Sequence, residues 1–227
     1  MSKINNVKDI EKFLEDVIDS YIISDINKLI EINEKHETSY PYLALAFSGI
    51  DFFGTLEKGI KNKDGTNKKN VGERFCWFIK EWMGKVNLLY KEECLARLIY
   101  NSCRNGILHN ALLKNTFIIS SFSIPKSEHL HLISKNSVFL HSIQFAEDFI
   151  EAQKKYREYI SSSTEKTYID ELCKNLNHLL DENKKANQSD TEKIICVLER
   201  SKDTITTSTN QTFTTSTTVT APPYWKE

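Results

Sequence analysis

The segment Leu98–Asn110 carries polar side chains inside an otherwise apolar helical pattern. Within it, Arg104 and His109 are residue types that suit acid–base chemistry at a phosphodiester. An imidazole accepts or gives a proton near neutral pH, and a guanidinium stabilises the charge that builds up on a phosphoryl group. Neither role needs a metal ion or a cofactor, so we predict a catalytic pair that uses none.

The spacing of this pair decides whether the two side chains can meet. Arg104 and His109 are five residues apart, which is about 140° around an ideal α-helix. They converge only if the helix loosens, for which Gly106 gives freedom, or if a second chain supplies one of them. Asn105 is i, i+4 to His109, so its amide could hydrogen-bond the imidazole and select its tautomer. The alternative is a plain helix C-terminus that Gly106 or Asn110 ends, where Arg and His complement the helix dipole.

A carboxylate in an unusual place is the next candidate. Asp51 lies in an almost wholly apolar helical pattern, where a charge is costly unless it is paired. We therefore predict that Arg74 or Arg104 is its partner. Such a pair would either orient the catalytic arginine or serve as a structural ion pair.

The distribution of charge favours an RNA backbone as ligand, although the net charge is only −1. No Asp or Glu occurs between Glu93 and Glu128, and a lysine-rich stretch precedes residue 71. The alternative is that the first segment is core and the second is a solvated loop. The RNA-binding residues that we predict are Lys61, Lys63, Lys68, Lys69, Arg97 and Lys114.

Histidine and cysteine side chains could bind a metal ion or act as nucleophiles, but they could also be ordinary surface or core residues. His129 and His131 would share one face of a strand, with His141 on the next strand, which suggests zinc. No cysteine or carboxylate spacing completes such a site, so we predict ordinary strand surface and no metal. Cys94 and Cys103 fall on an apolar helix and are predicted core thiols.

Apolar residues at spacings of three and four predict helices, and β-branched runs separated by Pro125 predict strands. Asn6 is the predicted N-cap of the first helix. A helix-forming pattern returns after the strands, and a last helix begins at Ser189 with a capping box to Glu192. The predicted helices are 6–35, 42–60, 73–86, 92–108, 142–161, 165–183 and one from Ser189, and the strands are 116–124, 129–133 and 138–141.

These elements predict a mainly α fold: a four-helix bundle with a small antiparallel β-ribbon at 116–141 and additional C-terminal helices. The predicted domains are a helical domain over 1–161, a helical extension over 162–200 and a tail over 201–227. The tail is rich in Thr and poor in large apolar residues, so we expect it to be extended or disordered.

Composition excludes several classes of protein. With 227 residues, 40% apolar and 27% charged, the chain is neither fully disordered nor collagenous. Five cysteines without a C-x-x-C pair fit a reducing compartment better than a disulfide framework. No apolar run approaches the roughly 20 residues that cross a bilayer, so we predict a cytoplasmic protein without a membrane partner.

The stretch Arg104-Asn105-Gly106-Ile107-Leu108-His109 resembles the R-x-x-x-x-H signature of the HEPN (higher eukaryotes and prokaryotes nucleotide-binding) superfamily. The upstream segments 46–54 and 72–75 are similar to a prokaryotic branch of it. The resemblance covers residues 7–160. It implies a metal-independent endoribonuclease, commonly a homodimer, with Arg104 and His109 as catalytic pair and Asn105 as support. A toxin or antiviral role, with an antitoxin or other protein partner, follows from the same resemblance, and a non-catalytic dimeric module that binds nucleotide, RNA or protein is the alternative.

Overall fold

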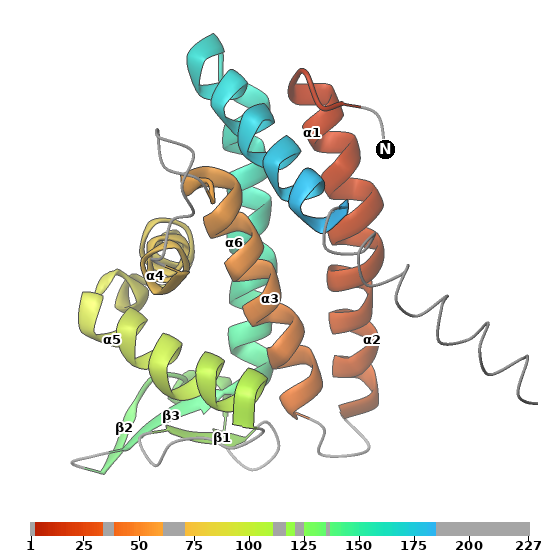
Figure 1. The fold of residues 1–227 in the computed structure, drawn as a ribbon. Coiled ribbons are helices and arrows are strands. Elements are labelled where there is room, and N and C mark those ends of the chain that lie inside the picture. Colours follow the sequence, from red (N-terminus) through yellow and green to blue (C-terminus); the bar gives the residue numbers. More distant parts are fainter. Residues whose placement is uncertain are drawn as a thin grey trace, which may run out of the picture. The chain divides into compact units, whose positions relative to one another are not determined.

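The structure is a computed structural model that describes residues 3–33, 39–60, 71–110, 117–120, 125–134 and 137–184. For residues 33, 39, 109 and 110 it describes the backbone only. The chain divides into two units, 1–180 and 181–227, and the elements named below lie in the first. This unit is mainly helical, as predicted, with one small sheet (Figure 1).

The N-terminal helix begins where the sequence predicts. The side chain of Asn6 accepts a hydrogen bond from the backbone N–H of Asp9 at 3.1 Å and so caps α1 (Val7–Phe13). The helix continues through a π-helical segment (Leu14–Ile23) into α2 (Ser24–Asn33). In the π-helical segment the backbone is wound more loosely, as the bond from the N–H of Ser24 to the carbonyl of Asp19 shows.

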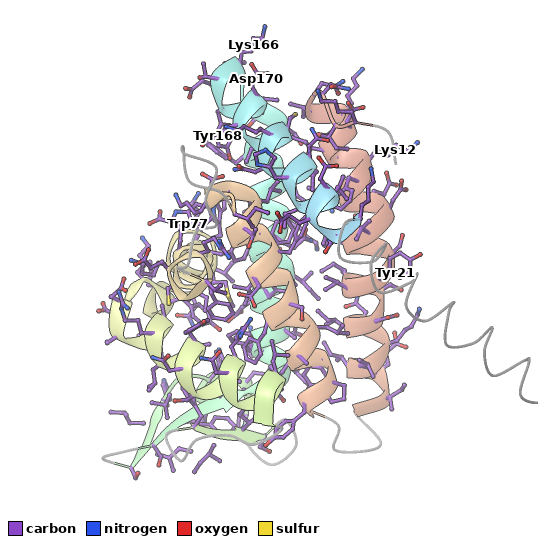
Figure 2. All side chains as sticks on the ribbon, viewed as in Figure 1. Lys12, Tyr21, Trp77, Lys166, Tyr168 and Asp170 are labelled. Atoms are coloured by element: carbon purple, nitrogen blue, oxygen red, sulfur yellow. The ribbon has the colours of Figure 1, made fainter. Side chains whose placement is uncertain are left out.

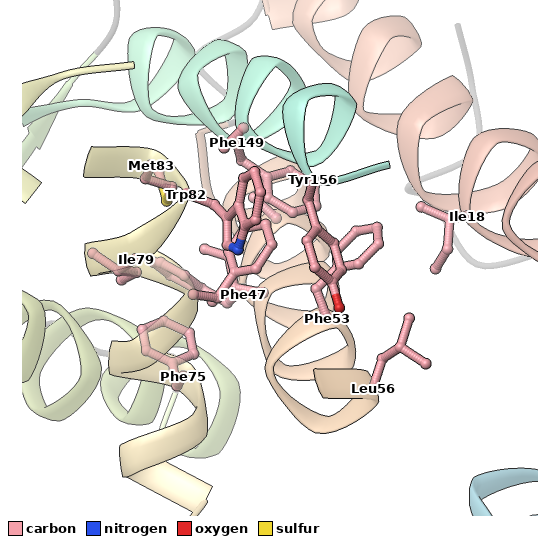
Figure 3. Packing of buried hydrophobic residues seen from close by; sticks show 14 of the residues in the cluster. Ile18, Phe47, Phe53, Leu56, Phe75, Ile79, Trp82, Met83, Phe149 and Tyr156 are labelled. Carbon is pink, nitrogen blue, oxygen red and sulfur yellow. The ribbon is translucent and has the colours of Figure 1, made fainter. Parts of the chain in front are cut away.

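Helix α3 (Ser39–Lys58) is the central element of the unit. It contacts α2, α4 (Val71–Glu81) and α6 (Ser142–Ser162), and most of its apolar side chains are fully buried. Figure 3 shows Phe47 and Phe53 packed among aromatic side chains of neighbouring helices. The ring of Phe53 stacks on Phe78 at 5.3 Å and meets Tyr156 edge-on at 5.6 Å. The prediction of a central helix here is therefore confirmed.

After α4 the chain makes two short 3₁₀ turns (Met83–Lys85 and Leu88–Lys91) and enters α5 (Glu93–Leu98). This helix continues into two π-helical segments, Ile99–Arg104 and Gly106–Asn110. We call the continuous element 93–110 the motif helix. The sequence predicts a helix in this region that could loosen at Gly106, but it does not predict π-helical winding from Ile99 onward.

The sheet contains β1 (Phe117–Ser120), β2 (Leu132–Ser134) and β3 (Ser137–His141), in the order β1-β3-β2. Strands β2 and β3 form the antiparallel pair that the sequence predicts. The prediction of a wholly antiparallel ribbon is wrong for β1, which runs parallel to β3 with Ile119 opposite Leu140. Since β2 is antiparallel to β3 and β1 is parallel to it, the two outer strands run in opposite directions.

A helix over residues 166–184 follows α6, and its part up to residue 180 belongs to the first unit. The side chain of Asn177 bonds both the N–H and the carbonyl of Ile4, at 3.0 and 2.7 Å. Tyr168 on the same helix (Figure 2) donates a hydrogen bond to Glu57 at 2.9 Å. These contacts tie the helix to the domain that the sequence predicts to end at residue 161, whereas the predicted helix from Ser189 and the tail lie outside the described residues.

None of the helices described here is both long and apolar enough to span a bilayer. Helix α3 approaches its neighbours closely at its glycines. At Gly54, an added Cβ would lie 2.3 Å from the carbonyl oxygen of Arg74, so α3 and α4 meet backbone to backbone there. This contact sets the spacing of the two helices that flank the candidate site.

We expect Gly54→Ala to lower the free energy of unfolding by about 1–3 kcal/mol, because the methyl group would force two packed helices apart. Urea denaturation measures this change. Ser48→Ala on the same helix is the control, since Ser48 is exposed and bonds only its own helix. Equal stability of the Gly54→Ala variant and the wild type would contradict the close crossing.

Candidate functional site

The π-helical winding changes the register of the candidate pair. The N–H of Asn105 bonds the carbonyl of Tyr100, five residues earlier, instead of the carbonyl four residues earlier. With i to i+5 bonding, positions five apart lie close to one turn apart. Arg104 and His109 lie in two successive π-helical segments, so the angle between their backbone positions is smaller than the 140° of an ideal α-helix. This is the loosening that their meeting within one chain requires.

Arg104 is held by the carboxylate of Asp51. Its Nε and Nη2 both donate to Asp51 Oδ2, at 2.9 and 2.7 Å, from the motif helix across to α3. The side chains are only 15% and 21% exposed, so the pair is partly shielded from water. Of the two partners predicted for Asp51, the structure therefore selects Arg104. A guanidinium bound through two of its nitrogens has a defined plane as well as a defined position.

Asn105 contacts the same guanidinium. Its Oδ1 accepts a hydrogen bond from Arg104 Nη1 at 3.0 Å. Asn105 thus supports the arginine, and the predicted bond to the imidazole of His109 stays a prediction because that side chain lies outside the description. Three nitrogens of Arg104 are accounted for by Asp51 and Asn105 together.

An aromatic ring lies beside the guanidinium. The ring centroid of Tyr100 is 5.6 Å from Arg104 Cζ, one turn earlier on the motif helix. Phe75 of α4 packs on Tyr100 at 5.4 Å. Gly72 approaches so closely that an added Cβ would lie 2.9 Å from Tyr100 Cε1. The first turn of α4 therefore forms the surface on which this ring rests.

Arg74, predicted as the other possible partner of Asp51, has a different hydrogen bond. Its Nη1 donates to the carbonyl oxygen of Gly59 at 3.3 Å, where Gly59 has a φ of +66° just beyond the end of α3. The side chain is buried, and burial lowers the pKa of its guanidinium. The charges of Asp51 and Tyr100 act in the opposite direction and raise this pKa. Arg74 thus binds a carbonyl oxygen just beyond the C-terminal end of α3. The ion pair with Asp51 is made by Arg104 instead.

The predicted RNA-binding residues fall in two groups. Arg97 is exposed on the motif helix and donates to Glu93 at 2.7 Å, one turn earlier. Glu93 also bonds Lys80 of α4, so this part of the surface carries both signs of charge. The remaining predicted residues lie outside the described residues: Lys61, Lys63, Lys68, Lys69 and Lys114.

The prediction that the histidines lie on strand surface is wrong for His129 and His141, which are only 5% and 3% exposed, whereas His131 is exposed as predicted. His129 Nδ1 accepts the backbone N–H of His141 at 3.1 Å, and its Nε2 lies 2.8 Å from the hydroxyl of Tyr90. His141 Nδ1 accepts the N–H of Gln144 and caps α6. Both imidazole rings therefore accept hydrogen bonds from backbone N–H groups inside the fold.

A carboxylate completes this second cluster. Tyr90 donates its O–H to Asp148 Oδ2 at 3.0 Å, and the amide of Gln144 donates to Oδ1 at 2.8 Å. With Nδ1 of His129 accepting, its Nε2 carries the proton and donates to Tyr90. Burial lowers the pKa of His129 to about 3 and raises the pKa of Asp148. The ring is neutral near pH 7, although it lies 3.6 Å from the carboxylate.

The sequence analysis missed Tyr90 and Asp148 as partners of the histidines. Asp148 follows Phe145 and Ala146 and precedes Phe149 on the buried side of α6, so it carries the same signal as Asp51: a carboxylate in an apolar pattern. Within the described ranges no group of three or more His, Cys, Asp or Glu side chains could hold a metal ion. Cys103 is buried as predicted, whereas Cys94 is exposed.

Comparison with known proteins does not assign the chain to a family. The chain matches no protein-family model, and neither the curated proteins nor the solved structures contain a significant match.

Removing the carboxylate that holds Arg104 should destabilise the fold. We expect Asp51→Ala to cost about 1–3 kcal/mol of unfolding free energy, because it leaves a partly buried guanidinium without its anion. Urea denaturation of the variant gives this value. Glu151→Ala, which breaks an exposed pair with Lys155, is the control and should change stability much less. A similar small effect for both variants would show that the Asp51 pair is solvated.

The His129 cluster should make stability depend on pH. The unfolded chain binds a proton at His129 below about pH 6.5, whereas the folded protein does so only near pH 3, so acid favours unfolding across this window. Between pH 7 and 5 we expect wild type to lose up to about 2 kcal/mol more than His129→Gln. The raised pKa of Asp148 acts in the opposite direction, because folding retains its proton above its usual pKa. Equal losses in the two proteins would contradict a neutral buried ring.

Proposed function

We propose that the protein is a metal-independent endoribonuclease of HEPN type, with Arg104 and His109 as the catalytic pair. The observation that carries the proposal is the π-helical winding of the motif helix, because it brings the backbone positions of these two residues close to one turn apart. π-helical turns are rare and are often found at functional sites. The resemblance to the R-x-x-x-x-H signature points to the same two residues.

The mechanism follows from the chemistry of the pair. His109 takes the proton of a ribose 2′-hydroxyl, the 2′-oxygen attacks the adjacent phosphorus, and the bond to the 5′-oxygen of the next nucleotide breaks. The proton then goes to that leaving 5′-oxygen. Arg104 stabilises the negative charge on the phosphoryl oxygens, while Asp51 and Asn105 keep its guanidinium in one orientation. The products carry a 2′,3′-cyclic phosphate and a free 5′-hydroxyl.

The proposed substrate is RNA, because the mechanism consumes a 2′-hydroxyl that DNA lacks. Contacts of Arg97, Lys61, Lys63, Lys68, Lys69 and Lys114 with the RNA backbone belong to this proposal. So do a homodimer, a cytoplasmic role as toxin or antiviral effector, and an antitoxin or other protein partner. The homodimer, the toxin or antiviral role and the protein partner rest on the family resemblance alone.

One observation favours the alternative, a non-catalytic helical module that binds nucleotide, RNA or protein. The guanidinium of Arg104 is already bound to Asp51 and Asn105, as it would be in a purely structural ion pair. A binding module and a nuclease differ in one outcome: only the nuclease breaks the strand that it binds.

The test is cleavage of a labelled RNA oligonucleotide by purified protein. We expect cleavage to persist in excess EDTA and to yield 2′,3′-cyclic phosphate ends, and we expect Arg104→Ala and His109→Ala each to lower the rate at least about 100-fold. Arg157→Ala is the matched control, since it breaks a comparable Arg–Asp pair with Asp19 at 2.7 Å on other helices. Binding without strand scission, or loss of cleavage in EDTA, would overturn the proposal.

Mixing the two inactive variants shows whether one chain holds the whole site. Because the π-helical winding favours convergence within one chain, we expect a mixture of Arg104→Ala and His109→Ala proteins to remain inactive after refolding together. Recovery of about one quarter of the wild-type activity would assign the pair to two chains. Sedimentation at several concentrations gives the oligomeric state needed to interpret the mixture.

A further inference from the structure

The segment Gly72–Phe75 is one of those that the sequence analysis singled out, and the proposed mechanism gives it no role. In the structure its residues have separate contacts. Arg74 bonds the end of α3, while Gly72 and Phe75 both lie against the ring of Tyr100. Tyr100 in turn lies beside the guanidinium of Arg104. The first turn of α4 is therefore connected to the candidate site through an aromatic ring.

The contacts define where this ring can lie. Gly72 leaves no room for a side chain, because a Cβ would come within 2.9 Å of Cε1 and 3.2 Å of Cζ of Tyr100. Phe75, which is fully buried, packs at 5.4 Å with its ring plane inclined by 55°. A half-buried ring with contacts on these sides has little freedom to rotate. Its position relative to Arg104 is therefore determined by α4 as well as by its own helix.

A ring placed in this way acts on the guanidinium. A cation within about 6 Å of an aromatic centroid is attracted to the ring, and the distance from Arg104 Cζ is 5.6 Å. Asp51 binds the guanidinium through Nε and Nη2, and Asn105 binds it at Nη1. Tyr100 supplies a contact of a different kind, with the π system, which restrains rotation of the guanidinium about its bonds to Asp51.

We propose that Tyr100 is a positioning residue for Arg104. Gly72 and Phe75 hold the ring of Tyr100 in place by packing against it. The hydroxyl group of Tyr100 takes no part in this role, so phenylalanine should replace tyrosine. The proposal rests on the proposed nuclease function for its kinetic consequence only. Its structural consequence, a guanidinium less firmly held when the ring is lost or displaced, can be measured without any activity.

The first measurement is therefore the rate of solvent exchange of the Arg104 Nε–H, followed by nitrogen-15 NMR of the full chain. We expect exchange to accelerate about fivefold in Tyr100→Leu and in Gly72→Ala, the ratio that corresponds to the loss of a contact worth about 1 kcal/mol. Tyr100→Phe should exchange as the wild type does. Unchanged exchange in Tyr100→Leu, with the fold intact, would overturn the proposal.

The second measurement is cleavage of the labelled RNA. We expect kcat to fall about fivefold or more in Tyr100→Leu and Gly72→Ala with KM unchanged, and Tyr100→Phe to restore it. Gly84→Ala is the control for a glycine inside a packed region, because the Cβ there meets the flexible side chain of Lys91 rather than a seated ring. Wild-type kcat in Tyr100→Leu would overturn the proposal.

The two measurements separate the two proposals. A wild-type protein that cleaves no RNA would remove the nuclease function, whereas faster Nε–H exchange in Tyr100→Leu would still support the positioning of Arg104. Active wild type with equally slow exchange in all variants would retain the nuclease and overturn the role of Tyr100.

Discussion

The ion pair between Asp51 and Arg104 is the constraint on which the arrangement of the site depends. A carboxylate on the central helix α3 needs a cation nearby, because water reaches it only in part. The motif helix supplies that cation and must therefore lie against α3 at the level of Asp51. The close crossing at Gly54 fixes α4 on the same helix, three residues further along. The pair thus determines where the motif helix lies as well as how its arginine is oriented.

Two carboxylates in this fold, the partly buried Asp51 and the buried Asp148, are accommodated in different ways. Asp51 is neutralised by a guanidinium, which keeps a formal charge of each sign at the edge of the core. Asp148 is bonded only by the neutral donors Tyr90 and Gln144, and burial raises its pKa. An ion pair keeps two formal charges at the edge of the core, whereas a network of neutral groups mainly fixes local geometry. The chemistry of the two clusters therefore differs although both began as a carboxylate in an apolar pattern.

The π-helical winding of the motif helix costs free energy that the surrounding residues must offset. π-helical turns are uncommon because they pack the backbone less well than α-helical turns, so they persist where the surroundings stabilise them. Here the buried side chains of Ile99, Ser102 and Cys103 anchor one π-helical segment in the core. Asp51 and the ring of Tyr100 bind the arginine at its end. Packing and electrostatics together thus hold the π-helical conformation of the segment that ends at Arg104.

Much of the fold was predictable because helical periodicity and the Asn6 cap are local properties of the chain, and the anomalous carboxylate Asp51 correctly indicated a basic partner. Local patterns also determined which residues are the candidates for the site, since Arg104, Asn105 and His109 lie within six consecutive residues. Only the tertiary structure decided that Arg104 rather than Arg74 binds Asp51, that His129 and His141 are buried, and that β1 runs parallel to β3. Each of these depends on groups that are distant in sequence, and the free energy of burying a charge or pairing a strand is set by whichever partner the packed core brings near.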